Sequence, residues 1–501
     1  MTTNKKFILL IIIILLVKIF LSVIVPLTGD EAYFIITGKY HLAWGYYEHP
    51  PIIWWLAYLL SGFGRYNPPI FVYRLFSVFS TVLIGIIMFL FLKEYDREKA
   101  FLISSIFLLS PLNILAVVFV NDIPLVLFTF LSGLFFFYGI KREKTKYFIW
   151  SGIFFGLAFL CKYFAVLYFL SLLLFCIYNK KNWKNFWIFV LSSFPLVFIN
   201  AYWNYTHQWV NLMFNLIYRN KHFFFKPKHI LMFFIYQIYL ITPWVLYYII
   251  RKGKKFFAFS EKKFLFFIFL YIIPILFLTY ISFKTGVGIH WTISFLPFLF
   301  LCIITLEIYQ LKNSFKYNIF FAGLQILFIS IICLLPITSL KKILKNFHKN
   351  SGYSDIVMFK TPEKICKRIN KFPSTYILAA QGYTGASIMS FYDKKYFVIF
   401  GSLSHSGRED DLISNFTEFN GKDFLIFCPE KPDKKFYKQF FKKVKIVTEK
   451  IEGANIYFVL GKQFIFKNYR NIILKKVLKD YWTVPKFLPH SGNPFKKKYN
   501  L

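Results

Sequence analysis

Two pairs of polar residues lie in the segment TGDEAYFIITGKYHLAWGYYEHPPIIWW, residues 28–55, which directly follows a long apolar run. Asp30 and Glu31 are adjacent, and Glu48 and His49 precede two prolines. A carboxylate can take a proton from an attacking hydroxyl group, and Glu or His side chains can bind a metal. Charged groups held in a partly dry cleft at a membrane boundary are costly and usually functional. This segment is therefore the first candidate site.

The segment around these residues is too aromatic to be a free linker, because it carries seven Tyr and Trp residues: Tyr33, Tyr40, Trp44, Tyr46, Tyr47, Trp54 and Trp55. Tyr and Trp are enriched at membrane interfaces, where amphipathic helices lie in the plane of the membrane. The Pro-Pro pair fixes the backbone and disfavours helix at the preceding residue. We expect interfacial helices here, and a stiff, defined geometry at Glu48 and His49.

Other charged residues are predicted near the same face of the membrane. Asp122, in VNDIP, begins another apolar run, where it is expected to cap a helix that carries Pro124 in its first turn. Lys162 separates two short apolar runs. It is the first candidate for a cation that binds a phosphate. The alternative is a snorkelling side chain, whose charged end extends to the membrane surface. Arg74 and Arg219 are weaker candidates for the same role, and packing or topology explains both more simply.

The whole chain is that of a polytopic α-helical membrane protein. It has 501 residues, of which 57% are hydrophobic, and long apolar runs recur along it. Phe7–Val25 lacks a clear cleavage site, so we expect an uncleaved first span. The sequence predicts eleven spans in total, the ten others lying at residues 69–92, 100–119, 123–140, 147–160, 163–179, 186–202, 231–250, 264–283, 291–310 and 317–337.

Basic residues set the predicted orientation. Lys and Arg number 61 against 23 Asp and Glu, and much of this excess lies in short loops such as KEYDREK, KREKTK and NKKNWK. Eleven spans place these loops on one side, as the positive-inside rule requires, and the acidic and aromatic segments on the other. Contact with anionic lipid and topology explain the charge, so no nucleic-acid partner is expected. We predict an inner (plasma) membrane protein whose C-terminal domain is extracytoplasmic.

The pattern changes after about residue 340. STYILAAQ, KYFVIFG, KDFLIFC, KVKIVTE and ANIYFVLG are short β-like runs, and TPEKICKRIN and PDKKFYKQFF are typical of helices. The predicted domains are therefore 1–340, a transmembrane domain with its first outer loop at 26–68, and 341–501, a soluble α/β domain. Cys366 and Cys428 could pair in an oxidising compartment, which the sequence leaves open.

Several blocks together resemble a known family. GDEAYFIITGKYHLAWGYYEHPPIIWWL, with VYRLFSV, VNDIPLVLFTF, GLAFLCKYFAVL and GIHWTISFLPFLFL in the same order, is similar to the dolichyl-phosphate-mannose protein mannosyltransferase superfamily. The similarity is to its bacterial branch, which includes the lipid A aminoarabinose transferases, and it covers roughly residues 8–340. The C-terminal part matches only loosely.

This resemblance implies the GT-C fold and transfer of one sugar from a polyprenyl-phosphate donor to a hydroxyl group at the outer face. The acceptor would be a lipid, a glycan or a protein, as in lipopolysaccharide or protein glycosylation. By motif, Asp30 matches the catalytic acid, Glu31 its companion and Asp122 a second acid of the cavity. Glu48 matches a carboxylate that binds a metal in some relatives, but His49 stands where the aminoarabinose transferases carry Lys. A divalent cation is therefore left open and no cofactor is required.

The residue types suit this chemistry. A phosphate-linked sugar already has a good leaving group, so one carboxylate base whose pKa is raised toward neutrality would suffice. One displacement predicts inversion at the anomeric carbon.

Two alternative functions remain. A flippase or transporter of lipid-linked oligosaccharides predicts charges within spans and repeat symmetry. An oligosaccharide ligase or polymerase with a lipid pyrophosphate donor predicts more outer-loop arginines than this chain has.

Overall fold

The computed structural model describes all residues except 1, 218–224, 254–255, 257–261, 346–351 and 486. The chain forms two compact units, which are described separately. The helical unit comprises residues 1–24, 70–200 and 220–331, and the mixed unit comprises residues 25–69, 201–219 and 332–501. The segment predicted as the first outer loop thus clusters with the C-terminal part of the chain, and the predicted domain boundary at residue 340 stays a prediction.

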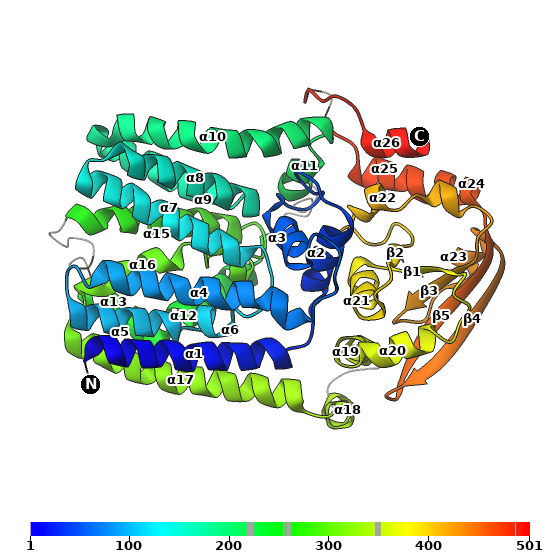
Figure 1. Cartoon of the computed structure of the whole chain (residues 1–501), viewed down its shortest axis with the longest axis horizontal. Helices are drawn as coiled ribbons and strands as arrows, with labels where there is room; N and C mark the ends of the chain where they lie inside the picture. The colour runs from blue at the N-terminus through cyan, green and yellow to red at the C-terminus, as the bar shows by residue number, and fades with distance from the viewer. Residues whose placement is uncertain (1, 218–224, 254–255, 257–261, 346–351, 486) are drawn as a thin grey trace. The chain divides into compact units, whose positions relative to one another are not determined.

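Six helices are long and apolar enough to cross a membrane, among the residues that the structure describes. Figure 1 shows them running along one direction in the helical unit. An apolar span needs about 20 residues to cross about 30 Å of hydrocarbon, and each of these helices has enough. They are α1 (Thr3–Ile24), α4 (Ile70–Leu92), α7 (Asp122–Arg142), α10 (Trp183–Thr206), α15 (Lys262–Ser282) and α17 (Ile308–Leu334).

The other predicted spans are helical but short or broken. These are α5 (Arg97–Leu108) with α6 (Pro111–Leu115), α8 (Thr145–Cys161), α9 (Ala165–Tyr178), α16 (Leu296–Cys302) with η4 (Ile303–Thr305), and α12 (Pro227–Ile241) with α13 (Pro243–Lys252). The last pair differs most from the prediction, because the chain bends by 96° at Thr242, just before Pro243, where one span was expected over 231–250. The break predicted at Lys162 is confirmed, since its backbone is extended between α8 and α9.

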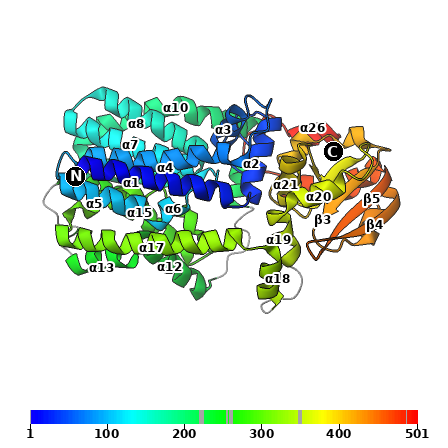
Figure 2. The ribbon, with the colours of Figure 1, turned by 60° about the horizontal axis from the view of Figure 1, so that its bottom comes forward.

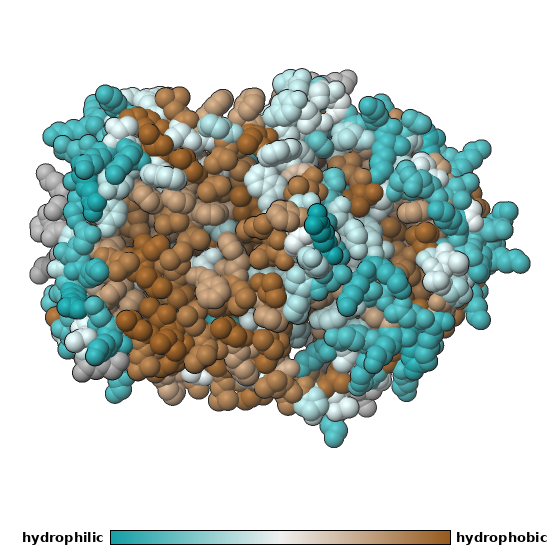
Figure 3. Space-filling model, in the orientation of Figure 1, coloured by the Kyte–Doolittle hydropathy of each residue, from teal (hydrophilic) through white to brown (hydrophobic). Residues whose placement is uncertain are grey.

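The surface of the helical unit is that of a membrane protein. Figure 3 shows a broad hydrophobic area over its long helices and hydrophilic residues at the end where the N terminus lies. The turns that join α4 to α5 and α7 to α8 lie at that same end in Figures 1 and 2. The basic segments KEYDREK and KREKTK span these turns and the adjoining helix ends. In α17 only 11% of the most apolar window is buried, so most of its side chains face outward.

The mixed unit contains a five-stranded sheet of order β2-β1-β3-β5-β4. Its strands are β1 (Ile377–Ala380), β2 (Val398–Ile399), β3 (Phe424–Cys428), β4 (Phe441–Ile451) and β5 (Ala454–Phe464). β1 pairs in parallel with β2 and β3, whereas β5 is antiparallel to β3 and β4. Each strand overlaps one of the predicted β-like runs, which confirms that part of the prediction, although β4 and β5 extend a few residues beyond their runs.

The mixed unit also contains helices, and one of them, α2, carries Asp30 and Glu31. The helices α2 (Gly29–Tyr40), α3 (Ile52–Leu60) and α11 (Val210–Leu216) come from the earlier segments of the chain. The C-terminal segment supplies α18 (Ile337–Lys345), α19 (Tyr353–Lys360), α20 (Pro362–Ile369), α21 (Tyr383–Asp393), α22 (Asp410–Ile413), α23 (Lys434–Lys438), α24 (Phe466–Tyr469), η7 (Arg470–Leu474), α25 (Lys475–Tyr481) and α26 (Pro494–Tyr499). α20 and α23 confirm the two helices predicted in this part, and α2 and α3 confirm helix in the aromatic segment.

An aromatic core holds the mixed unit together. Phe400, Phe424 and Phe441 are buried and in mutual contact, with ring centroids 5.5 to 5.8 Å apart. Tyr47, from the aromatic segment between α2 and α3, packs into the same core against Trp482. Burying large rings of this kind supplies most of the favourable free energy of packing. The early segment is therefore part of the fold of the C-terminal one.

Candidate active site

Helix α2 begins with a capping box that separates Asp30 from Glu31. The Thr28 hydroxyl accepts a hydrogen bond from the Glu31 backbone N–H, and Glu31 Oε2 accepts one from the Thr28 backbone N–H at 3.1 Å. Reciprocal bonds of this type satisfy N–H groups that have no partner within the helix. Glu31 is fully buried. The sequence signature T-x-x-E at 28–31 could have predicted this cap.

Asp30 lies beside Glu31 but faces away from it and is exposed. The Tyr383 hydroxyl, at the start of α21, donates a hydrogen bond to Asp30 Oδ1 at 2.8 Å. The two adjacent acids therefore differ: Glu31 is buried, whereas Asp30 is an exposed carboxylate that one tyrosine holds.

Glu48 is buried and has three hydrogen-bond donors. Its Oε1 accepts from the backbone N–H groups of Gly407, at 2.6 Å, and Arg408, at 3.0 Å, and its Oε2 accepts from the Tyr33 hydroxyl at 2.7 Å. Burial raises the pKa of Glu48 to about 7, although these hydrogen bonds favour the charged form. Both oxygens of Glu48 thus accept hydrogen bonds from the protein, and its predicted role in binding substrate stays a prediction.

The segment 407–411, GREDD, supplies a second carboxylate to the same loop. Glu409 is fully buried; its Oε2 accepts from the backbone N–H of Tyr47 at 2.8 Å, and its Oε1 lies 3.2 Å from His41 Nε2. Burial lowers the pKa of His41, but the hydrogen bond and charge of Glu409 outweigh burial and raise it overall. His49 is half-buried, with its ring 6.5 Å from that of Phe34.

Asp122 and Lys162 form a buried ion pair in the helical unit. Lys162 Nζ lies 2.8 Å from Asp122 Oδ1, and both side chains are less than a tenth exposed. Asp122 is the first residue of α7 and Asn121 occupies the cap position, where no side-chain hydrogen bond is made. The predicted capping role of Asp122 is therefore wrong by one residue, because its carboxylate binds Lys162 instead. The sequence singled out both residues, but not their pairing.

The remaining predicted cations are less informative. Arg74 is buried in α4, where its Nη1 donates to the backbone oxygen of Ser22 at 2.9 Å. Arg219 lies outside the described residues. This contact with a backbone oxygen at a helix end is consistent with the packing role that the sequence favoured for Arg74.

The described part of the chain contains no group of three or more His, Cys, Asp or Glu side chains that could hold a metal ion. A metal bound through Glu48 would need further ligands of this kind, and its own oxygens already accept three hydrogen bonds. Cys366 and Cys428 are free and buried, so the disulfide left open by the sequence is not formed. Cys366 Sγ lies 3.9 Å from Met389 Sδ instead.

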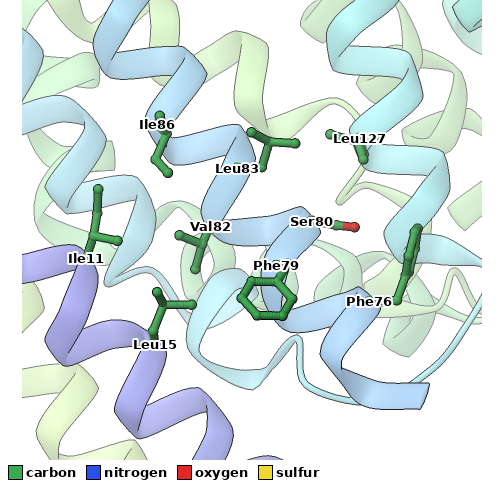
Figure 4. A pocket seen from close by; sticks show the side chains of 9 residues that line it. All are labelled: Ile11, Leu15, Phe76, Phe79, Ser80, Val82, Leu83, Ile86 and Leu127. Atoms are coloured by element: carbon green, nitrogen blue, oxygen red, sulfur yellow. The ribbon is translucent and has the colours of Figure 1, made fainter. Parts of the chain in front are cut away.

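Figure 4 shows an apolar groove of about 490 Å³ in the helical unit. Side chains from α1, α4 and α7 line it, and Ser80 is the one polar residue among the nine: Ile11, Leu15, Phe76, Phe79, Ser80, Val82, Leu83, Ile86 and Leu127. A lining of this kind suits a hydrocarbon chain and offers no charge to a sugar or phosphate. The candidate chemistry therefore rests with the carboxylates described above.

These features define a multi-pass α-helical membrane protein with a mixed α/β unit that folds around its first polar segment. Comparison with known proteins shows which family and which relatives this chain is similar to. The family model for dolichyl-phosphate-mannose-protein mannosyltransferase matches residues 48–203. GPI mannosyltransferase 1 of Saccharomyces cerevisiae is 27% identical over 153 residues, which are 30% of this chain and 36% of the yeast protein. The match thus spans about a third of that relative.

Solved structures share the fold over almost the whole chain. ArnT from Cupriavidus metallidurans bound to undecaprenyl phosphate superposes with a TM-score of 0.63, covering 91% of this chain and 98% of ArnT at 12% identity. Its apo form gives a TM-score of 0.62. These matches show that the chain shares the GT-C fold of ArnT. The family-model match over residues 48–203 agrees with the resemblance to the dolichyl-phosphate-mannose protein mannosyltransferase superfamily.

Proposed function

We propose that this protein moves a single sugar from a polyprenyl-phosphate donor to a hydroxyl group of a lipid, glycan or protein acceptor at the outer face of the inner membrane. The observation that carries the proposal is the exposed carboxylate of Asp30, held by Tyr383 in a chain with a membrane glycosyltransferase fold. The solved ArnT with undecaprenyl phosphate supports a polyprenyl-phosphate donor, and the apolar groove of Figure 4 is suited to lipid chains.

In this mechanism the acceptor oxygen attacks the anomeric carbon as Asp30 takes the hydroxyl proton. The new glycosidic bond forms while the bond between that carbon and the phosphate oxygen breaks, and polyprenyl phosphate leaves with the electron pair. The leaving group is already a stable anion, so no strong acid is required. A single displacement inverts the configuration at the anomeric carbon. General-base assistance contributes typically about 10²–10⁴-fold in rate.

The proposed roles of Lys162 and Asp122 have to take account of the ion pair between them. Their ion pair buries both charges, so Lys162 is available to a donor phosphate only if that phosphate replaces or joins Asp122. Removing one partner of a buried pair leaves an uncompensated charge and costs typically about 3–5 kcal/mol. A test of donor binding therefore compares Lys162→Met with the double variant Lys162→Met/Asp122→Asn, which removes both charges. If Lys162 binds the donor, the donor KM rises in both variants.

The experiment for the reaction itself uses the purified full chain with a polyprenyl-phosphate sugar, with and without added acceptors. We expect donor consumption only when an acceptor is present, release of polyprenyl phosphate, and an inverted anomeric centre in the product by NMR. A flippase would move donor across a vesicle without consuming it. A ligase or polymerase would require the lipid pyrophosphate donor. Either result would overturn the proposed reaction.

A further inference from the structure

The first turns of two helices from distant parts of the chain meet at Asp30. Gly29 opens α2, and a Cβ atom placed on it would lie 2.6 Å from the Thr384 side chain in α21. Real Cβ atoms do not approach so closely, so this contact depends on glycine. It brings the Tyr383 hydroxyl within 2.8 Å of Asp30 Oδ1. The two helices therefore meet closely at the proposed base.

Tyr383 is itself held by two neighbours. Its ring packs edge-on against Tyr33, with centroids 5.6 Å apart and an interplanar angle of 81°. Gly407, with φ +80°, lies so close that a Cβ atom on it would be 2.3 Å from Tyr383 Cβ. Burial raises the pKa of Tyr383, and the charge of Asp30 raises it further. The hydroxyl therefore keeps its proton and acts as a donor.

Glu48 completes the connection between these neighbours. Its Oε2 accepts from Tyr33, which supports the ring of Tyr383, and its Oε1 accepts from the backbone of Gly407 and Arg408. The buried carboxylate thus links both groups that contact Tyr383. These three hydrogen bonds join Tyr33 to the backbone at Gly407 and Arg408, so the network fixes the ring of Tyr383 in one position.

We infer that Tyr383 is a positioning residue for the proposed catalytic base, supplied by the C-terminal segment of the chain. It binds Asp30 Oδ1 and so orients the carboxylate, which leaves Oδ2 for the acceptor proton. This inference rests on the proposed function of Asp30. Proton transfer requires the base within hydrogen-bond reach of the attacking hydroxyl, and a carboxylate on an exposed helix start would otherwise rotate about its side-chain bonds.

The test is a kinetic comparison of Tyr383→Phe in the full-length protein, with wild-type and Asp30→Asn backgrounds. Phe keeps the ring contact with Tyr33 and loses only the hydroxyl. We expect kcat for sugar transfer to fall roughly tenfold, as for loss of one hydrogen bond to a charged group, with the donor KM unchanged. Because Tyr383 acts through Asp30, the same change in the Asp30→Asn background should cost little further.

Tyr353→Phe is the matched control. Its hydroxyl donates to the backbone oxygen of Glu452 at 2.7 Å in the same unit, so it removes a tyrosine hydrogen bond of similar length away from Asp30. Its kcat should equal that of the wild type. Equal kcat for Tyr383→Phe and wild type, or a full additional loss in the Asp30→Asn background, would overturn the inference.

A second measurement separates this inference from the proposed reaction. Hydrogen–deuterium exchange of the peptide covering residues 28–40 reports on the α2 contact without any substrate. We expect faster exchange at the start of α2 in Tyr383→Phe and not in Tyr353→Phe. An inactive wild-type protein with this exchange difference would reject the proposed reaction while retaining the contact. An active wild type with no exchange difference and no kcat difference would reject the inference alone.

Discussion

Adjacent acids in one helix turn have opposite environments. Successive residues of an α-helix are rotated by about 100° because a turn takes 3.6 residues. Glu31 therefore points into the protein, where it closes the capping box, while Asp30 points outward to Tyr383. Glu31, the companion of the catalytic acid by resemblance, thus caps the helix in this structure, while Asp30 is the proposed base.

Asp30→Asn should lower single-turnover sugar transfer from a polyprenyl-phosphate donor by roughly 10²–10⁴-fold, because the carboxamide cannot accept the proton. Insertion and donor binding should be unaffected, since no apolar contact is removed. Glu31→Gln should cost far less, because Gln also serves at this position of a capping box. Normal transfer by Asp30→Asn would mean that Asp30 is not the base.

Glu48 makes the stability of the mixed unit depend on pH. Its pKa is about 7 in the folded protein against 4.5 ordinarily, so the folded state holds a proton that the unfolded state has lost between these values. Stability therefore falls as pH rises through this interval. Each pKa unit corresponds to about 1.4 kcal/mol, so the total is on the order of 3 kcal/mol.

The matched comparison is the thermal unfolding midpoint of wild type and Glu48→Gln at pH 5 and pH 8. The wild type should lose more stability on going to pH 8 than the variant, which cannot ionise at this position. Burial also raises the pKa of Asp411 to about 6, and Asp410 is raised as well. These groups contribute in both proteins, so the difference reports on Glu48. Parallel curves would show that Glu48 titrates normally.

At the scale of elements, Lys360 joins the last turn of α17 to the end of α19. Its Nζ donates to the backbone oxygens of Ile332, Cys333 and Leu335 at 2.9 to 3.0 Å. The last carbonyl groups of a helix have no partner within it, and a cation there also interacts favourably with the helix dipole. The end of a predicted membrane span is thus held by the first helices that follow it.

Lys360→Met should lower the thermal midpoint of the purified protein, with a loss of about 1 kcal/mol. The side chain keeps its apolar length but cannot donate. Lys367→Met, on the exposed face of α20, is the control and should leave the midpoint unchanged. Equal midpoints for both variants would show that the three hydrogen bonds contribute nothing measurable.

Local pattern predicted most elements but few of the contacts between them. The apolar runs, the break at Lys162 and all five strands follow from periodicity and turn residues within short windows. Glu48 could not be placed in the same way, because its partners are Gly407 and Arg408, 359 and 360 residues further along. Tyr383 gave no local signal at all. The dense charge run GREDD was the one available sign that buried charges gather in the C-terminal segment.

For the whole molecule, the orientation of the C terminus depends on the number of crossings. Eleven crossings with the N terminus inside place the C-terminal segment outside, whereas the 96° bend between α12 and α13 would change the count if that pair does not cross. The basic turns at the N-terminal end of the helical unit favour the cytoplasm for that end.

A fluorescent reporter that matures only in the cytosol, fused after Leu501, should therefore be dark. The same reporter fused after Lys99, in the first turn of α5 at the end of the basic segment KEYDREK, should be bright. Bright fluorescence from both fusions would establish an even number of crossings.

The hydrogen bond between Glu48 and Gly407 cannot form until the ribosome has synthesised residue 407. At roughly 5–20 residues per second, the 359 residues between them take roughly 20 to 70 seconds to emerge. Over that interval the first polar segment, with its tyrosines and tryptophans, lacks the partners that bury it in the complete chain. A ribosome that stops before residue 407 leaves a membrane-inserted chain whose earliest folded segment never closes. A defect at the end of the chain therefore leaves a segment near its beginning without its packing partners.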